Sequence, residues 1–247
     1  EEKKSVPAGF ETVPAKGLGK DSPYSFRMQV SPYDCLGCGV CLTACPAEGA
    51  LTMTSFEDMK PEQTLFDEVA MNESYLKKDV INDKSVKNVQ FAKPYFQFSA
   101  ACAGCAETTY IKLLSQLFGD RMYIGNAAGC SSAISGGAPI LPYCKDCQGH
   151  GPAWEHSLFE DNAEFGYGML LAQKQIRERL AMDAQQLLDT PVADKAQAWL
   201  DTYEDAATNT EPAQALIAAL QTAALEGDAK AAAADFLKDA DYAAKKY

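Results

Sequence analysis

The chain has 247 residues, of which 47% are hydrophobic and 23% charged, as in ordinary globular proteins. Its formal net charge of −12 excludes the basic surface that nucleic-acid binding requires. No stretch approaches the ~20 apolar residues of a membrane span, and no apolar signal-peptide segment is present. The sequence therefore predicts a cytoplasmic protein that binds neither nucleic acid nor membrane.

Nine cysteines are the most informative residues of this composition. An odd number of cysteines, in a chain without an export signal, argues against a framework of disulfides. Seven of the nine fall into two groups along the chain, and a further pair follows them. Their spacing therefore indicates what each group binds.

The first group lies at residues 35–46, in the pattern C-x2-C-x2-C-x3-C-P of a bacterial ferredoxin loop around a [4Fe–4S] cluster. This spacing allows one tight loop to hold three corners of the cluster, and Gly37 and Gly39 allow the backbone to approach the sulfurs. A zinc ion is the alternative to the cluster, but zinc is usually held by two separated C-x2-C pairs. The pattern therefore predicts these iron–sulfur ligands: Cys35, Cys38, Cys41 and Cys45.

The fourth cysteine of the loop, Cys45, has two alternative roles. It either closes the cluster of its own loop or, as in two-cluster ferredoxins, ligates a neighbouring cluster whose other ligands lie outside this chain. Alternating residues at 26–30 predict a short strand before the loop, and residues 51–53 a return strand after it. These features predict a ferredoxin-like region over residues 1–60.

A polar segment, expected as a linker over residues 61–95, precedes the second group of cysteines. Cys102 and Cys105 form a C-x2-C pair directly before a helix that apolar spacing predicts over residues 110–117. A buried strand is expected at residues 122–124.

Cys130 lies in a loop of small residues that follows this strand. A loop–helix–strand–loop order suits an α/β sheet with its site at the C-terminal end of the strand, so Cys102, Cys105 and Cys130 could meet there. The spacing alone leaves open whether they hold a cluster, hold zinc, are redox-active or are buried thiols.

The C-terminal third, residues 171–247, is rich in alanine and acidic residues, with apolar residues at helical spacing. This pattern predicts several packed amphipathic helices rather than one long coiled coil. Thr210 is the expected start of one helix and Gly227 its end, and Asp228 is the expected cap of the last. Their apolar residues are expected to form a core and not a cofactor site.

Several strings of the sequence occur in the same order in one enzyme family. They are residues 7–10, the first cysteine loop, and residues 98–107, 117–122, 129–132, 151–154 and 157–166. On these strings the chain resembles the pyruvate:ferredoxin (flavodoxin) oxidoreductases. The resemblance is to an internal segment, the second ferredoxin motif plus the first part of the thiamine diphosphate domain, and residues 171–247 match only loosely.

The resemblance implies an enzyme that oxidatively decarboxylates pyruvate with thiamine diphosphate and Mg²⁺ and forms acetyl-CoA. Its electrons pass through [4Fe–4S] clusters to ferredoxin or flavodoxin. The resemblance further implies that three cysteines of the first group hold one cluster and that Cys45 completes its neighbour. Cys102, Cys105 and Cys130 would ligate the cluster nearest the thiamine, and Glu107 and Cys130 would lie against thiamine diphosphate.

The chain also departs from the family's pattern. It lacks a second ferredoxin loop, a fourth ligand for the thiamine-proximal cluster, the motif that holds Mg²⁺ and diphosphate, and the domains for pyruvate and CoA. Ala106 and Ala128 stand where Gly and Thr are expected. The resemblance therefore implies a chain that has no catalytic residues, is inactive in isolation, and works with the remainder of a homodimeric oxidoreductase, in the same chain or in other subunits.

Cys144 and Cys147 form a further C-x2-C pair, in a loop where the family usually has none. One of them could replace the missing fourth ligand. We favour the alternative, two loop thiols or a pair that oxidises reversibly, because Lys145 and exposure suit a reactive thiol. Of the two histidines, His150 is expected at the surface of its loop, and His156 receives no role.

The predicted fold class is α+β or α/β. It comprises a ferredoxin-like region at 1–60, a linker at 61–95, a partial thiamine-type α/β region at 96–170 and a helical segment at 171–247. Iron–sulfur electron transfer within a 2-oxoacid oxidoreductase is the leading hypothesis for function. A stand-alone ferredoxin-like carrier with a helical interaction module is the alternative, and a zinc-stabilised scaffold is the third.

Overall fold

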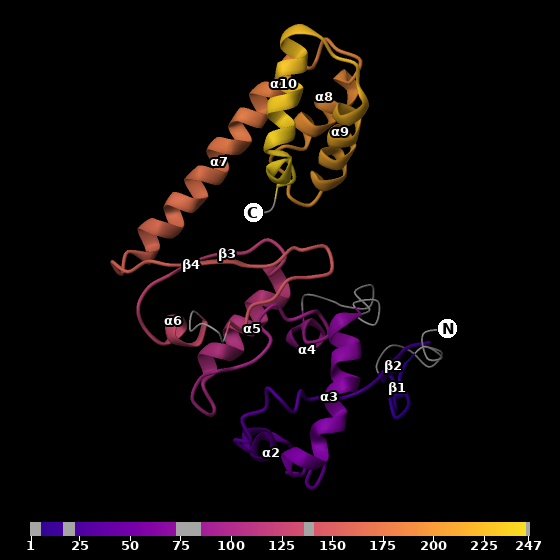
Figure 1. Ribbon diagram of the computed structural model, residues 1–247, viewed down its shortest axis with the longest axis vertical. Helices are drawn as coiled ribbons and strands as arrows, with labels where there is room; N and C mark the ends of the chain where they lie inside the picture. The colour runs from indigo at the N-terminus through magenta and orange to yellow at the C-terminus, as the bar shows by residue number, and fades with distance from the viewer. Residues whose placement is uncertain (1–5, 17–22, 73–84, 136–140, 246–247) are drawn as a thin grey trace. The chain divides into compact units, whose positions relative to one another are not determined.

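The computed structural model of the chain describes residues 6–16, 23–72, 85–135 and 141–245. It divides into two compact units, Glu1–Glu160 and Asp161–Tyr247. In Figure 1 the first unit is indigo and magenta, and the second is orange and yellow. The first unit combines helices with two small sheets, and the second is helical. The chain is therefore of the general α+β class that the sequence predicts.

The first unit begins with a two-stranded antiparallel sheet, in which Val13 pairs with Phe26. Its elements up to residue 72 are β1 (Val13–Pro14), β2 (Ser25–Phe26), α2 (Val40–Ala44) and α3 (Phe56–Met71). The strand expected at 26–30 is thus confined to Ser25–Phe26. The prediction of a return strand at 51–53 is wrong, because those residues form no strand. Met53 instead lies 4.0 Å from the point where a Cβ on Gly37 would lie.

Helix α3 occupies the first part of the segment expected as a linker. The side chain of Ser55 caps it by accepting a hydrogen bond from the amide of Asp58, at 3.2 Å. Acidic side chains in the first turn also suit the positive end of a helix dipole. Arg27 forms a 2.5 Å ion pair with Glu62, which fastens the helix to the segment after β2.

The rest of the first unit contains a parallel pair of strands with helices. Its elements are α4 (Val86–Val89), α5 (Ala106–Phe118), β3 (Tyr123–Asn126), α6 (Cys130–Ser135) and β4 (Ala153–His156). β3 and β4 are parallel, and Asn126 is paired with His156 at their C-terminal ends. The helix predicted at 110–117 is confirmed as α5. The strand predicted at 122–124 is present as β3, but it is not buried as expected, because Tyr123 is exposed and Ile124 half-buried.

The segment before the second cysteine group is packed on α5. The buried hydroxyl of Ser115 accepts a hydrogen bond from the amide of Phe96, at 3.0 Å, and Gln116 donates to the carbonyl of Ala92, at 2.9 Å. Tyr95 and Phe96 are themselves buried. These contacts fix the chain that leads to Cys102 against α5.

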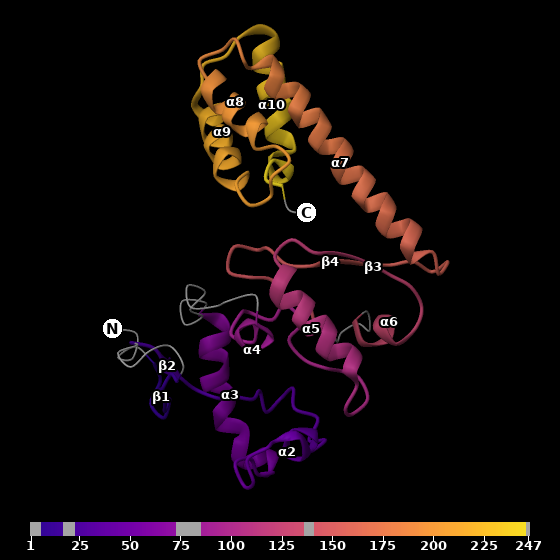
Figure 2. The same ribbon diagram turned by 180° about the vertical axis from the view of Figure 1, so that it is seen from behind.

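The second unit is a helical bundle with one core. Its elements are α7 (Asn162–Gln186), α8 (Ala193–Asp201), α9 (Thr210–Thr222), α10 (Gly227–Lys238) and the short 3-10 helix η3 (Ala240–Tyr242). Figures 1 and 2 show α8, α9 and α10 around the C-terminal half of α7, whose N-terminal half extends away from them. Trp199 is fully buried at the centre, with its ring edge-to-face with those of Tyr203 and Phe236.

The helix ends in this unit differ from the expectation at two points: Gly227 does not end α9, and Asp228 is not the cap of α10, because Glu226 is its N-cap and Asp228 lies in its first turn. α9 begins at Thr210, as predicted, but it ends at Thr222, and Gly227 begins α10 instead of ending α9. The hydroxyl of Thr222 donates back to the carbonyls of Ala218 and Ala219, and Ala223 is extended. In the part of the chain that the structure describes, no helix is both long and apolar enough to cross a bilayer.

Candidate functional site

The first cysteine loop is shaped by two glycines with left-handed backbone conformation. Gly37 has φ 65° and Gly39 has φ 72°, values at which other residues are strained. Helix α2 starts directly after Gly39 and carries Cys41, and Cys45 is its C-cap, with its amide bonded to the carbonyl of Cys41 at 3.1 Å. The two glycines thus make the turns on either side of Cys38.

The start of this loop is held by a residue that the sequence analysis did not single out. Gln63 on α3 accepts hydrogen bonds at its Oε1 from the hydroxyl of Ser31, at 3.0 Å, and from the amide of Tyr33, at 3.2 Å. The carbonyl of Ser31 in turn accepts from the amide of Cys35, at 3.1 Å. No spacing rule connects residues 32 positions apart, so no signal in the single sequence marks Gln63.

The second group is arranged around the N-terminus of α5 and the loop after β3. Cys105 is the N-cap residue of α5, and its amide is bonded to the carbonyl of Cys102 at 3.0 Å. Gly104, at φ 74°, makes the turn between these two cysteines. Thr108 donates to the carbonyl of Cys105, at 3.2 Å, and accepts from Ser99, at 3.0 Å, so its hydroxyl fixes this turn.

Cys130 is the first residue of α6, beyond the C-terminal end of β3. The buried Asn126 accepts a 2.7 Å hydrogen bond from the hydroxyl of Ser131, which ties this loop to the strand end. Glu107, expected against thiamine diphosphate, is exposed in the first turn of α5. Its role and that of Cys130 toward this cofactor remain predictions.

The two cysteine groups lie near each other at one point. A Cβ on Gly104 would lie 3.9 Å from Cγ2 of Val40, the first residue of α2. The turn between Cys102 and Cys105 is therefore adjacent to α2, the helix that follows Gly39.

The predicted ligands fit iron–sulfur chemistry in the kind of donor they offer. All of the chain's cysteines carry thiols and lie at the surface or half-buried on loops and helix ends. Among the described residues, which include every cysteine, no three His, Cys, Asp or Glu side chains are gathered as around a metal ion. The ligand sets therefore remain predictions, although the glycine turns and the thiols suit the group.

The two histidines have different surroundings. The imidazole Nδ1 of His150 is 3.7 Å from a carboxylate oxygen of Asp146, at an exposed position. The ring of His156 is stacked on that of Trp154, with centroids 6.2 Å apart. Its buried Nδ1 has no hydrogen-bond partner among the residues that the structure describes.

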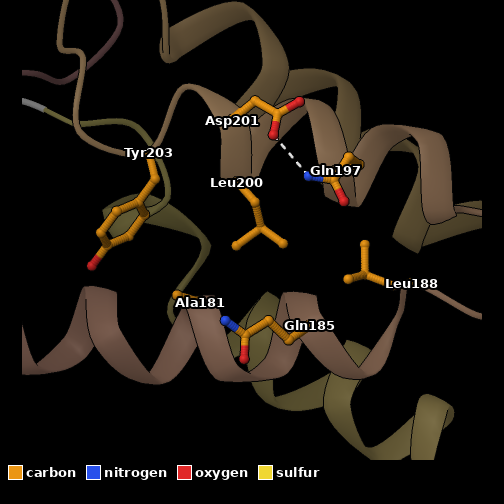
Figure 3. A pocket seen from close by; sticks show the side chains of 7 residues that line it. All are labelled: Ala181, Gln185, Leu188, Gln197, Leu200, Asp201 and Tyr203. Atoms are coloured by element: carbon orange, nitrogen blue, oxygen red, sulfur yellow. Dashed lines mark hydrogen bonds between the residues drawn. The ribbon is translucent and has the colours of Figure 1, made fainter.

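The second unit contains a hollow that carries no catalytic arrangement. Figure 3 shows its lining from α7, α8 and the adjoining turns: Ala181, Gln185, Leu188, Gln197, Leu200, Asp201 and Tyr203. Gln197 donates a 2.7 Å hydrogen bond to Asp201, so the one carboxylate of this lining is partnered. The hollow lies between α7 and α8.

Comparison with known proteins identifies relatives along nearly all of the chain. The pyruvate:ferredoxin oxidoreductase of Moorella thermoacetica is 43% identical over 98% of this chain and 21% of its own length. The pyruvate-flavodoxin oxidoreductase of Enterobacter agglomerans is 48% identical over 76% of this chain and 16% of its own length. The probable pyruvate-flavodoxin oxidoreductase of Escherichia coli is 37% identical over 98% of this chain and 20% of its own length.

The chain thus spans about one fifth or less of the length of these curated relatives. No family model matches it.

Proposed function

This chain belongs to the pyruvate:ferredoxin (flavodoxin) oxidoreductases as one segment of their length, and from that premise we propose that it is an iron–sulfur electron-transfer segment of such an enzyme. The complete enzyme would be a cytoplasmic homodimer that oxidises pyruvate with thiamine diphosphate, Mg²⁺ and CoA. Ferredoxin or flavodoxin would receive the electrons.

The cysteine loop at residues 35–46 carries this proposal. Its C-x2-C-x2-C-x3-C-P spacing is that of a [4Fe–4S] loop, and Gly37 and Gly39 adopt the left-handed conformations that let the backbone approach sulfur atoms. When bound, such a cluster accepts and releases single electrons. The three cysteines Cys35, Cys38 and Cys41 would hold it from one loop.

The second group would extend the same role. Cys102, Cys105 and Cys130 would hold a second cluster, for which Gly104 and the hydroxyl of Thr108 shape the turn. Glu107, exposed beside this turn, would face thiamine diphosphate in the complete enzyme. Gly104 and Val40 are neighbours, which supports electron transfer between the clusters proposed for the two cysteine groups.

A stand-alone electron carrier with a helical module is the second candidate. The cysteine loop supports it equally well, because that loop alone makes a carrier. The lengths of the relatives favour the first candidate, a segment of a larger enzyme, because the chain spans only about a fifth of their length.

The test is the iron and acid-labile sulfide content of anaerobically prepared chain, together with EPR spectra of the reduced state. We expect about four irons from the first group alone and about eight if both groups assemble clusters. Cys38→Ser should remove the first signal and Cys102→Ser the second. Cys147→Ser is the matched control and should change neither.

Two results would contradict the iron–sulfur part of the proposal, and a third would contradict the role of the chain as a segment. One is zinc in place of iron, which would support a structural scaffold. The other is an iron content that neither Cys38→Ser nor Cys102→Ser lowers. Pyruvate oxidation by the isolated chain would contradict its role as a segment that requires the remainder of the enzyme.

A further inference from the structure

The loop at residues 142–151 carries the last two cysteines, Cys144 and Cys147, which the proposed clusters do not use. Its first part is paired with the chain before the second cysteine group. The amide of Gln97 donates to the carbonyl of Pro142, at 2.9 Å, and the amide of Cys144 donates to the carbonyl of Tyr95, at 3.0 Å. Cys144 is therefore held in a short antiparallel pairing with the buried segment that packs on α5.

Asp146, between the two cysteines, organises the rest of the loop. One of its carboxylate oxygens accepts hydrogen bonds from the amides of Gln148, at 2.9 Å, and His150, at 2.8 Å. The other oxygen accepts from the hydroxyl of Tyr95, at 3.1 Å. Burial acts to raise the pKa of Asp146, but these hydrogen bonds outweigh it, so the pKa lies below its usual value. The carboxylate is therefore ionised at neutral pH and holds the loop closed.

Cys147 lies at the second position of a tight turn inside this loop. The amide of Gly149 donates to the carbonyl of Asp146, at 3.0 Å, which closes the turn. The return chain is pressed against the start of the loop, because a Cβ on Gly151 would lie 2.5 Å from the carbonyl oxygen of Cys144. Cys144 and Cys147 are thus three residues apart in a loop fixed on both sides.

The surroundings of the two thiols differ. Cys147 is exposed, whereas Cys144 is half-buried, and its thiol donates to the carbonyl of Pro94, at 3.7 Å. Exposure determines which thiol a reagent in solution meets first. Among the described residues no three metal-ligating side chains, those of Asp146 and His150 included, are gathered as around a metal ion.

We propose that Cys144 and Cys147 are a thiol–disulfide exchange site that takes low-molecular-weight disulfides of the glutathione class. The Cys147 thiolate attacks one sulfur of the incoming disulfide, forms a mixed disulfide, and releases one glutathione thiolate. The Cys144 thiolate then attacks Cys147 Sγ and releases the second glutathione. Two electrons pass from the two cysteines to the incoming disulfide, and the two protons lost by the cysteines go to the two glutathione thiolates.

Closing this disulfide would further constrain the loop that holds Tyr95. The carbonyl of Tyr95 is bonded to the amide of Cys144, and its hydroxyl to Asp146. The exchange site is therefore attached to the segment that leads into Cys102. It is distinct from the proposed cluster ligands, and the disulfide itself is detected without reference to iron.

The experiment uses the full chain, prepared anaerobically and equilibrated in glutathione buffers of increasing oxidised fraction. After acid quenching and alkylation, a non-reducing tryptic digest separates Cys144 from Cys147, because Lys145 lies between them. We expect the two peptides to be joined to each other as the oxidised fraction rises, and to separate on addition of dithiothreitol. The Cys102–Cys105 pair, with the same spacing, is the internal control and should not respond in the same range.

Single variants test the order of the two steps. In Cys144→Ser the mixed disulfide should accumulate on Cys147, because nothing resolves it. In Cys147→Ser the half-buried Cys144 should collect roughly tenfold less glutathione under the same conditions. Serine is close to cysteine in size, so both variants should keep the loop.

Three results would overturn the proposal. The first is full alkylation of both thiols at every buffer ratio. The second is stable glutathione on both cysteines of the unchanged chain without a link between them. The third is loss of iron in the double variant Cys144→Ser/Cys147→Ser, which would assign the pair to a cluster instead.

Discussion

Arg177 is a buried guanidinium that fastens the end of the chain to α7. Its side chain donates to the carbonyls of Tyr242, at 2.9 Å, and Ala243, at 2.7 Å, and to that of Tyr203, at 2.6 Å. The guanidinium also lies 4.5 Å from the centre of the Tyr203 ring. Only 3% of the residue is exposed, and the carbonyl of Ala243 also accepts a hydrogen bond from the indole of Trp199, at 2.9 Å.

Arg177→Met should lower the stability of the second unit by about 2–4 kcal/mol, because three carbonyls lose a charged donor in a buried place. The measurement is urea unfolding followed by Trp199 fluorescence, in a Trp154→Phe background so that Trp199 alone reports. Arg179→Met is the control. Arg179 is exposed and paired with Asp239, so its loss should change stability by less than about 1 kcal/mol. Equal effects of the two variants would contradict the role given to Arg177.

At the residue scale the sequence predicts the cysteines as ligands, which stays a prediction, and it gives no sign of the contacts made by Gln63 and Arg177. The positions of Cys35 to Cys45 follow from spacing, because one short loop contains them all. Gln63 and Arg177 could not be found in this way, since their partners lie far away along the chain. A charged residue on an otherwise amphipathic helix is expected to face solvent, and Arg177 does the opposite because backbone carbonyls satisfy it.

At the element scale, the end of α5 is packed against the segment that carries Tyr95. Gly119 caps this helix with an ordinary helical φ of −59°, so backbone strain does not explain the glycine. A Cβ there would lie 2.3 Å from the carbonyl oxygen of Ser115, and 2.4 Å and 2.6 Å from ring carbons of Tyr95, which is itself buried. The carbonyl of Ser115 and the ring of Tyr95 together therefore require a glycine at this position.

Gly119→Ala should destabilise this packing by about 1–3 kcal/mol, because either Tyr95 or the helix end must move. Hydrogen exchange, read by mass spectrometry, should become faster in residues 92–97 and 142–146, which share hydrogen bonds with Tyr95 or its neighbours. Gly166→Ala is the control: a Cβ there has no atom within 4 Å among the described residues, and alanine favours the helix by about 1 kcal/mol. Unchanged exchange in Gly119→Ala would disprove the contact.

Elements with a long apolar period were predictable and short ones were not. α5, with apolar residues at three- and four-residue spacing, was confirmed, as was the start of α9. The strand at 51–53 was wrong because three alternating residues carry little information, and Leu51 and Met53 are exposed. The prediction that Gly227 ends α9 was wrong. Its positive φ lies at the first residue of α10, after α9 has already ended.

At the scale of the whole molecule, the two units differ in how completely they bury apolar surface. The second unit has one contiguous core around Trp199, Leu216 and Phe236, and its described exposed large apolar side chains are confined to α7. The first unit has a smaller core and many exposed apolar side chains, among them Leu158 at 81% and Phe159 at 88%. Large exposed apolar surface is typical of a surface that another chain or segment covers.

Residues 161–247 should therefore fold when produced alone. We expect helical circular dichroism and a cooperative unfolding transition within about 1 kcal/mol of that of the same unit in the full chain, because its core contains no residue of the first unit. The matched piece, residues 1–160, should associate or bind a hydrophobic dye. A non-cooperative transition of the helical piece, with loss of its near-ultraviolet signal, would show that it depends on the rest.

The surface position of the cysteines bears on how the chain matures. Every predicted ligand lies exposed or half-buried on a loop or a helix end, and none is enclosed in a core. A carrier that delivers a preassembled cluster could therefore reach these thiols after α3 and α5 have formed. If the proposed clusters are bound at these cysteines, a chain that has already folded could still take them up.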